Sequence, residues 1–159
     1  MPSTTIEISK EYLHFAAAHF TIFSKEVREN LHGHNFFVAA QIDAEIGDDG
    51  LTFDYNLIKS KLKSLCDTLD EQVLLPTNSP YLELQSEDGY IVAAFNGERL
   101  PFLARDVLTL PLRNITIEEL AHWFIGELKA DPEIAALEIR RINIKVSSGA
   151  GQWASADDS

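Results

Sequence analysis

The sequence predicts an α+β fold in which an antiparallel sheet packs against two helices. Two observations predict it. Several segments alternate apolar and polar residues as strands do, and two longer segments carry apolar residues at the 3- and 4-residue spacing of one buried helical stripe. The order is strand, strand, helix, hairpins, helix, strand. Strands and helices that segregate in this way favour an antiparallel sheet.

The first strands are expected near the N-terminus. Residues 5–9 alternate in polarity, and the aromatic and alanine-rich residues 12–20 could continue this strand after a bend. Residues 35–42 are apolar with β-rich ends, which predicts a second strand. Residues 46–50 have turn chemistry, and residues 51–53 are expected to re-enter the sheet.

Two helices follow from their caps and apolar stripes. The first is expected to begin at Asp54, a good N-cap, and to end near Leu69. The second is expected from Thr116 to Lys129, with Thr116 and Glu119 forming a capping box. Both segments place their apolar residues on one face, so both should pack against the sheet.

The region between the two helices, residues 76–113, is predicted to be an insertion that forms a small β-meander. Asp-Gly and Asn-Gly pairs within it are hairpin signals. Residues 139–146 alternate and predict the last strand. We expect one domain over residues 1–159, with residues 154–159 forming a frayed tail.

Composition excludes several classes of protein. Acidic residues number 25 against 13 basic ones, and the net charge of −12 argues against non-specific binding to nucleic acid or to an anionic membrane. No apolar run approaches the roughly 20 residues that span a bilayer. The single cysteine, Cys66, excludes an internal disulfide, and no secretory signal is visible, so a cytoplasmic location is expected.

The sharpest motif is His32-Gly33-His34. Side chains two residues apart on an extended segment point to the same face, and Gly33 lets another group approach closely. Two neutral imidazoles can bind zinc, and a third from a neighbouring strand would leave positions open for water or substrate. His19 is the natural third ligand and His14 is the competitor. The alternative is that such an isolated pair is a surface or structural feature.

Three dispersed motifs occur in one order along most of the chain: FAAAH (15–19) followed by ENLHGHN (29–35), LTFDY (51–55), and TIEELA (116–121). Together they resemble the 6-pyruvoyltetrahydropterin synthase family, which also contains the 6-carboxytetrahydropterin synthase of deazapurine biosynthesis. The resemblance implies the tunnelling fold, a four-stranded antiparallel sheet with two helices on one face. It also implies a homo-oligomeric barrel, often a hexamer of two trimers, with active sites at subunit interfaces.

The same resemblance implies a zinc-dependent lyase. Zinc would be held by His19, His32 and His34, and the substrate would be 7,8-dihydroneopterin triphosphate or a related dihydropterin. Zinc can acidify C–H bonds next to the substrate oxygens that it binds. A base then moves protons, and elimination of phosphate or cleavage of a carbon–carbon bond follows.

One departure from the family concerns the catalytic base. Family members usually place a cysteine before His-Gly-His, whereas this chain has Glu29 there, and Cys66 lies on the apolar stripe of the first helix. The pattern resembles a variant subgroup that uses glutamate and forms 6-hydroxymethyl-7,8-dihydropterin, a folate precursor. A carboxylate can act as base when burial raises its pKa, although nearby zinc would oppose that rise. The alternative is that Glu29 is a solvated loop residue.

Two further departures concern proton transfer and pterin binding. Asp70-Glu71 stands where the family has Asp-His, and Ser147 begins a pair that replaces a pterin-gripping Glu-Thr. The resemblance assigns proton transfer to Asp70 and Glu71, and a pocket-lining role to Thr116, Glu118 and Ser147. Asp70-Glu71 could instead simply end the first helix in water. Two other functions therefore stay open: a different heterocyclic substrate on this scaffold, or a zinc-bearing binding protein without catalysis.

Overall fold

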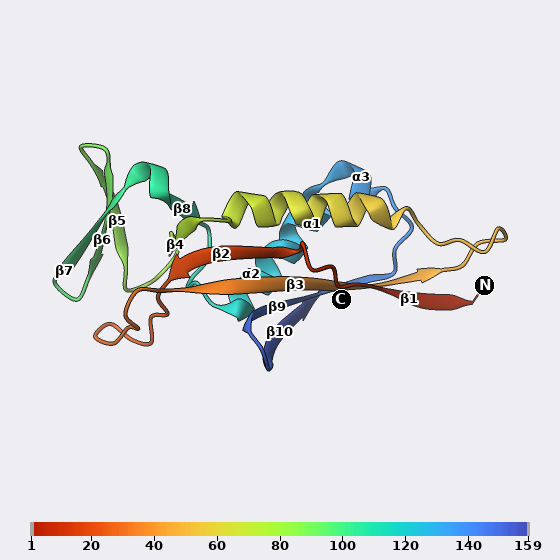
Figure 1. Cartoon of the computed structure of the whole chain (residues 1–159), viewed down its shortest axis with the longest axis horizontal. Coiled ribbons are helices and arrows are strands. Elements are labelled where there is room, and N and C mark those ends of the chain that lie inside the picture. The colour runs from red at the N-terminus through yellow and green to blue at the C-terminus, as the bar shows by residue number, and fades with distance from the viewer. Residues whose placement is uncertain (1, 159) are drawn as a thin grey trace.

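The computed structural model describes residues 2–158, in which a long curled sheet forms the body of the molecule (Figure 1). Over these residues the main sheet has seven strands in the order β10-β9-β3-β2-β4-β8, with β1 also paired to β3. The strands are β1 (Ser3–Ile8), β2 (His14–His19), β3 (His32–Glu45), β4 (Gln72–Pro76), β8 (Val107–Leu110), β9 (Arg141–Gly149) and β10 (Gln152–Asp157).

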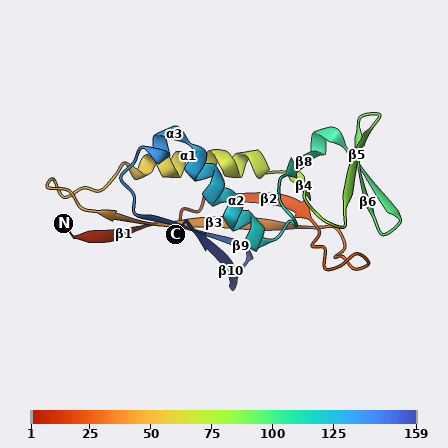
Figure 2. The same ribbon diagram turned by 180° about the vertical axis from the view of Figure 1, so that it is seen from behind.

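The helices pack against this sheet and share one core with it. They are α1 (Tyr55–Leu69), α2 (Ile117–Ala130) and the short α3 (Pro132–Ala135), and a 3₁₀ turn, η1 (Ala104–Asp106), precedes β8. Helix α1 contacts β2, and α2 contacts β9 and β10. Seen from behind, α2 crosses the sheet obliquely (Figure 2). No helix among residues 2–158 is long and apolar enough to cross a membrane.

Both predicted helices are confirmed, and each begins at a residue whose side chain caps the first turn. The Asp54 carboxylate accepts a hydrogen bond from the Asn56 backbone N–H at 3.0 Å and caps α1. Thr116 caps α2 by accepting from the Glu119 N–H at 3.1 Å. Each helix buries one apolar stripe, with α1 burying Ile58, Leu62, Leu65, Cys66 and Leu69.

The expected four-stranded antiparallel sheet is corrected in two respects. The sheet is wider, and it is mixed, because β4 runs parallel to β2 and to β8. The chain turns from α1 into β4 through Glu71, whose φ of 59° is left-handed. Strand β4 is a short apolar run without alternation, so it carries no half-buried strand pattern. Strand β8 thus returns part of the 76–113 insertion to the main sheet.

Two terminal or loop expectations also differ from the structure. Residues 51–53 form no strand, and lead directly into the cap of α1. The segment 154–159, expected to be frayed, contributes residues up to Asp157 to β10, which pairs with β9, whereas Ser159 lies outside the described residues. The chain turns at Gly149–Gly151, where Gly151 adopts the positive φ of 91° that lets β9 and β10 form a hairpin.

The predicted meander is present and projects from one end of the molecule, opposite the N-terminal end (Figure 1). It consists of β5 (Glu83–Glu87), β6 (Tyr90–Phe95) and β7 (Glu98–Leu103), paired antiparallel. Its apolar side chains pack against Phe20, Ile22 and Leu75 to form a second small core. The insertion is therefore joined to the loop that follows β2.

The main core leads directly to the histidines. Residues opposite one another on β2 and β3 share a face, and the rings of Phe15 and Phe36 stack there with centroids 4.9 Å apart. Two steps further, Ala17 lies opposite His34, and His19 lies opposite His32. The histidines therefore continue the buried face of the sheet beyond its apolar part.

Candidate metal centre

Three histidines converge at the end of β2 and the start of β3. One ligand nitrogen from each of His19, His32 and His34 lies within 4.8 Å of the others. His14 lies opposite Phe37, a position that alternates with the core-facing residues of β3, so it faces the other side of the sheet. The choice of His19 over His14 as the third member is therefore supported by the strand register.

The Nδ1 atoms of two rings are fixed by backbone oxygens. His19 Nδ1 donates to the Ile115 carbonyl at 2.8 Å, and His32 Nδ1 donates to the Asn30 carbonyl at 2.7 Å. Because a carbonyl oxygen can only accept, both neutral rings carry their proton on Nδ1 and a lone pair on Nε2. Such a second bond is the usual way in which a metal-binding histidine is oriented.

The Nε2 atoms have the environment expected of a cation site. His19 Nε2 is buried and has no hydrogen-bond partner among residues 2–158, which would cost about 1–3 kcal/mol if nothing bound it. The Nε2 atoms of His32 and His34 are 2.9 Å apart, so both rings converge on the same point. Three imidazole nitrogens are a ligand set that suits Zn²⁺ and leaves a position for substrate.

Electrostatics favour the metal-binding form of the rings. Burial lowers the pKa of His19, and the neighbouring His32 and His34 lower it further, although the Ile115 carbonyl and Glu29 oppose this. Burial and the adjacent His32 also lower the pKa of His34. Both rings are therefore held neutral near neutral pH, as metal ligation requires.

Glu29 lies beside the triad in the loop that joins β2 to β3. Its Oε1 accepts from the Thr21 N–H at 2.9 Å, and its own N–H donates to the Thr21 carbonyl at 2.8 Å. Burial alone would raise the pKa of Glu29, but the hydrogen bonds from Thr21 and the charges of His32 and His19 lower it overall. The rise in pKa expected from the sequence for a carboxylate base is therefore not found: Glu29 is ionised at neutral pH, but its lowered pKa makes it a weaker base than an ordinary glutamate.

The adjacent acids, Asp70 and Glu71, hold the end of α1 against β2. Asp70 Oδ1 accepts from the Ala16 N–H at 2.8 Å, and the Glu71 N–H donates to the Ala16 carbonyl at 2.6 Å. Glu71 lines a hollow of about 520 Å³ together with Gly33, His34 and Asn35 of β3. Within one chain neither acid is hydrogen-bonded to the triad among the described contacts, and their part in proton transfer stays a prediction.

The three predicted pocket residues lie in different places. Thr116 directly follows Ile115, whose carbonyl is hydrogen-bonded to His19, so it lies one residue from a contact of the triad. Glu118 is exposed in the first turn of α2. Ser147 is buried opposite Phe37 on β9, and its hydroxyl is hydrogen-bonded to the Gly149 backbone. The structure therefore places Ser147 on the face of the sheet that the histidines do not share.

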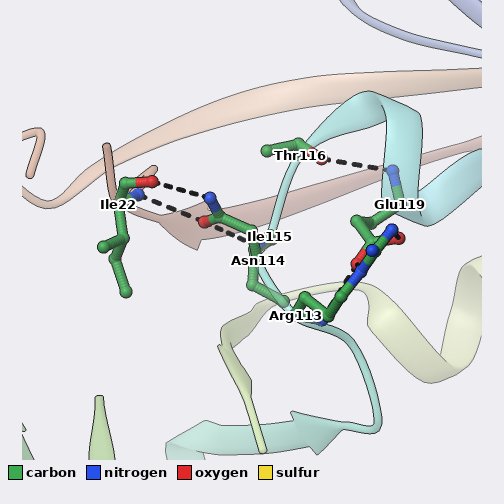
Figure 3. Close-up of polar contacts among 6 residues, drawn as sticks. All are labelled: Ile22, Arg113, Asn114, Ile115, Thr116 and Glu119. Atoms are coloured by element: carbon green, nitrogen blue, oxygen red, sulfur yellow. Dashed lines mark hydrogen bonds and ion pairs between the residues drawn. The ribbon is translucent and has the colours of Figure 1, made fainter. Parts of the chain in front are cut away.

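The start of α2 is fixed by a variation on the predicted capping box (Figure 3). Thr116 accepts from the Glu119 N–H, but the Glu119 carboxylate does not return to the cap. It accepts instead from the Arg113 backbone N–H at 3.0 Å and from the guanidinium Nε at 2.9 Å. These bonds hold the turn in which the Ile115 carbonyl lies next to His19. The sequence carries no signal for this carbonyl, because any residue type supplies one.

Cys66 takes no part in the site. It is fully buried in the stripe of α1, and burial raises the pKa of its thiol to about 12. A thiol with so high a pKa forms almost no thiolate at neutral pH. The expectation that Cys66 cannot replace the cysteine of other family members is supported.

The curled sheet, the helices on it and the histidine triad together define a tunnelling-fold protein with a histidine cluster suited to binding a metal ion. The chain belongs to the 6-pyruvoyl tetrahydropterin synthase family, a family of pterin-processing enzymes, whose sequence profile matches residues 7–158. Two archaeal relatives are each described as "Putative 6-carboxy-5,6,7,8-tetrahydropterin synthase". The one from Methanocaldococcus jannaschii is 29% identical over 145 residues, which cover 89% of this chain and 88% of the relative. The one from Pyrococcus abyssi is 28% identical over 83% of this chain and 78% of its own.

Solved structures agree with the fold along the whole chain. The 6-pyruvoyl tetrahydropterin synthase of Plasmodium vivax superposes with a TM-score of 0.92 at 25% identity and covers 99% of both chains. That of Plasmodium falciparum gives a TM-score of 0.91 at 28% identity and covers 98% of both. The P. vivax enzyme has also been solved as two variants in which a catalytic glutamate is replaced by alanine or by cysteine.

Proposed function

We propose that the chain is a zinc-dependent lyase that cleaves the side chain of 7,8-dihydroneopterin or its triphosphate and forms 6-hydroxymethyl-7,8-dihydropterin. The observation that carries this proposal is the ionised Glu29 held beside His19, His32 and His34. A carboxylate stands where other family members have a cysteine. The catalytic glutamate described for the P. vivax enzyme supports the same role for Glu29.

The three histidines would hold Zn²⁺, which supplies Lewis acidity toward substrate oxygens. Cleavage of the side chain requires that a base remove a hydroxyl proton while the carbon–carbon bond breaks and a carbonyl forms on the departing fragment. Glu29 is the base in this proposal, and its bond from Thr21 aims the carboxylate. A proton must then return to the carbon retained on the pterin. Asp70 and Glu71 are proposed to assist this transfer, and Thr116, Glu118 and Ser147 to line the pocket.

We further propose a homo-oligomer with active sites between subunits. The position of Ser147 supports it, because in one chain Ser147 lies opposite Phe37, on the face of the sheet that the histidines do not share. A neighbouring subunit could bring its own side chains to the triad. Mixing an inactive His34→Ala chain with an inactive Glu71→Ala chain, after dissociation and reassembly, should restore part of the activity. Mixtures that stay as inactive as either parent would contradict shared sites.

The reaction is tested with zinc-loaded protein, dihydroneopterin and its triphosphate, and products identified by mass. The expected product is 6-hydroxymethyl-7,8-dihydropterin. The net charge of −12 favours the dephosphorylated substrate, so the two should be compared at equal concentration. Bound zinc without turnover of either compound would refute the lyase and leave a binding protein or a different heterocycle.

A second candidate activity is that of a 6-carboxytetrahydropterin synthase, which the names of the archaeal relatives favour. The absence of a cysteine before His-Gly-His in this sequence counts against it. The same assay separates the two, because the carboxylated and hydroxymethylated pterins differ in mass. Release of 6-carboxytetrahydropterin as the main product would favour this candidate over the first.

A further inference from the structure

The side chain of Asn114 joins two segments that are 92 residues apart in the sequence (Figure 3). Its Nδ2 donates to the Ile22 carbonyl at 2.8 Å, and its Oδ1 accepts from the Ile22 N–H at 3.1 Å. The amide thus satisfies both backbone groups of one residue, as a neighbouring strand would. This pair of bonds fastens the loop after β2 to the turn before α2.

On one side, Asn114 is connected to the metal ligand His19. Oδ1 also accepts from the N–H of Ile115 at 3.1 Å. Ile115 is fully buried, and its carbonyl receives the Nδ1–H of His19 at 2.8 Å. The amide of Asn114 therefore restrains the residue whose carbonyl sets the orientation and the tautomer of that ring.

On the other side, Asn114 is connected to the candidate base. The peptide group between Thr21 and Ile22 is hydrogen-bonded at both ends. Its oxygen accepts from the Glu29 N–H at 2.8 Å, and its N–H donates to Asn114. The Thr21 N–H in turn donates to the Glu29 carboxylate at 2.9 Å. A displacement of this peptide group would move Glu29 relative to the histidines.

We propose that Asn114 is a positioning residue that fixes the candidate base Glu29 relative to His19 by holding the Thr21–Ile22 peptide and Ile115 in one frame. The proposal rests on the metal site and base of the proposed function. Asn114 can hold both Ile22 and Ile115 because its side-chain amide supplies a donor and an acceptor in a fixed plane. Alanine supplies neither, and aspartate supplies only acceptors.

The test uses the full-length protein with Asn114→Ala and Asn114→Asp. Loss of a group that supports a metal ligand typically weakens metal binding 10–100-fold, so Asn114→Ala should lower zinc affinity by about 10-fold in a chelator competition. Asn114→Asp keeps the acceptor for Ile115 but loses the bond to the Ile22 carbonyl. Its zinc affinity should therefore lie nearer to wild type, while its kcat falls with that of the alanine variant.

A second measurement separates positioning from stability and needs no metal. In ¹⁵N-histidine-labelled, metal-free protein, His19 should show the Nδ1–H tautomer, and Asn114→Ala should give a mixture of tautomers. Leu62→Ala, in the core of α1, is the control that lowers stability without touching the turn. Asn114→Ala with wild-type zinc affinity and tautomer, and only a lowered Tm, would overturn the proposal. If wild-type protein binds no zinc, the proposed metal function fails, and the tautomer alone decides whether Asn114 orients His19.

Discussion

His19 donates from Nδ1 to the carbonyl oxygen of Ile115 at 2.8 Å, although 96 residues separate the two in the sequence. This bond joins β2 to the turn before α2 and turns Nε2 of the ring toward His32 and His34. The candidate metal centre therefore depends on tertiary structure, even though two of its three histidines lie two residues apart on one strand.

Replacement of His19 or His34 by alanine should abolish tight zinc binding, because two imidazoles remain where three are needed. Zinc per chain, measured by mass spectrometry after dialysis, should fall from about one to a trace. His14→Ala is the matched control, since His14 starts the same strand but hydrogen-bonds to the Glu11 carbonyl on the other face. Equal loss of zinc in His14→Ala would argue against this ligand set.

Glu29→Gln should reduce kcat by about 10²–10⁴-fold, the usual contribution of a general base, and leave zinc content unchanged. Glutamine can still accept from the Thr21 N–H, so the loop should keep its shape. Glu26→Gln, on the exposed part of the same loop, should retain full activity. The role of Glu29 would be refuted by a Glu29→Gln enzyme that turns over as fast as wild type.

The stability of the start of α2 should depend on pH through Glu119. Hydrogen bonds from Arg113 hold the pKa of Glu119 below its ordinary value of 4.5, and burial only partly opposes them. Because the folded pKa is the lower one, the stabilisation is present above pH 4.5 and is lost as the pH falls through the folded value. Urea unfolding should show Glu119→Gln less stable than wild type at pH 7 and the two converging in acid. Glu127→Gln, on the same helix, is the control, and a constant gap at every pH would contradict the assignment.

Arg28→Ala should loosen the attachment of the meander. The Arg28 guanidinium carbon lies 5.1 Å from the Phe20 ring centroid and 5.9 Å from that of Phe95 in β6, and the Nη1 of Arg28 donates to the Glu29 carbonyl at 2.9 Å. We expect a loss of about 1–3 kcal/mol in the free energy of unfolding. Arg99→Ala, which removes an exposed pair with Glu87, should cost less than about 1 kcal/mol. Equal losses would show that Arg28 acts as an ordinary surface charge.

The parts of the fold that the sequence predicts are those with a local physical signal. Asp54 and Thr116 cap helices through their own side chains, and the stripes of α1 and α2 repeat at the helical period. Strand β4 has no comparable signal, because it is short, apolar and buried, and its parallel partners come from distant segments. The parallel pairing could therefore only be found in the folded chain.

The candidate site likewise has a part that the sequence predicts and a part that it does not. The histidines are visible because imidazoles are rare and their spacing on a strand has a geometric meaning. The groups that orient them, the Ile115 and Asn30 carbonyls, are main-chain atoms that every sequence contains. Asn114 is a side chain, but an asparagine before a helix is common in turns, and its link to Ile22 becomes visible only in three dimensions.

The burial of Cys66 has a practical consequence for studies of assembly and motion. The chain has one thiol, and that thiol lies in the core with a pKa raised to about 12, so maleimide reagents should not modify the folded native protein. A cysteine introduced at an exposed position, such as Glu83 in β5, would then be the single reactive point for a fluorophore or spin label. Distances between labelled subunits could be measured without first removing the native cysteine.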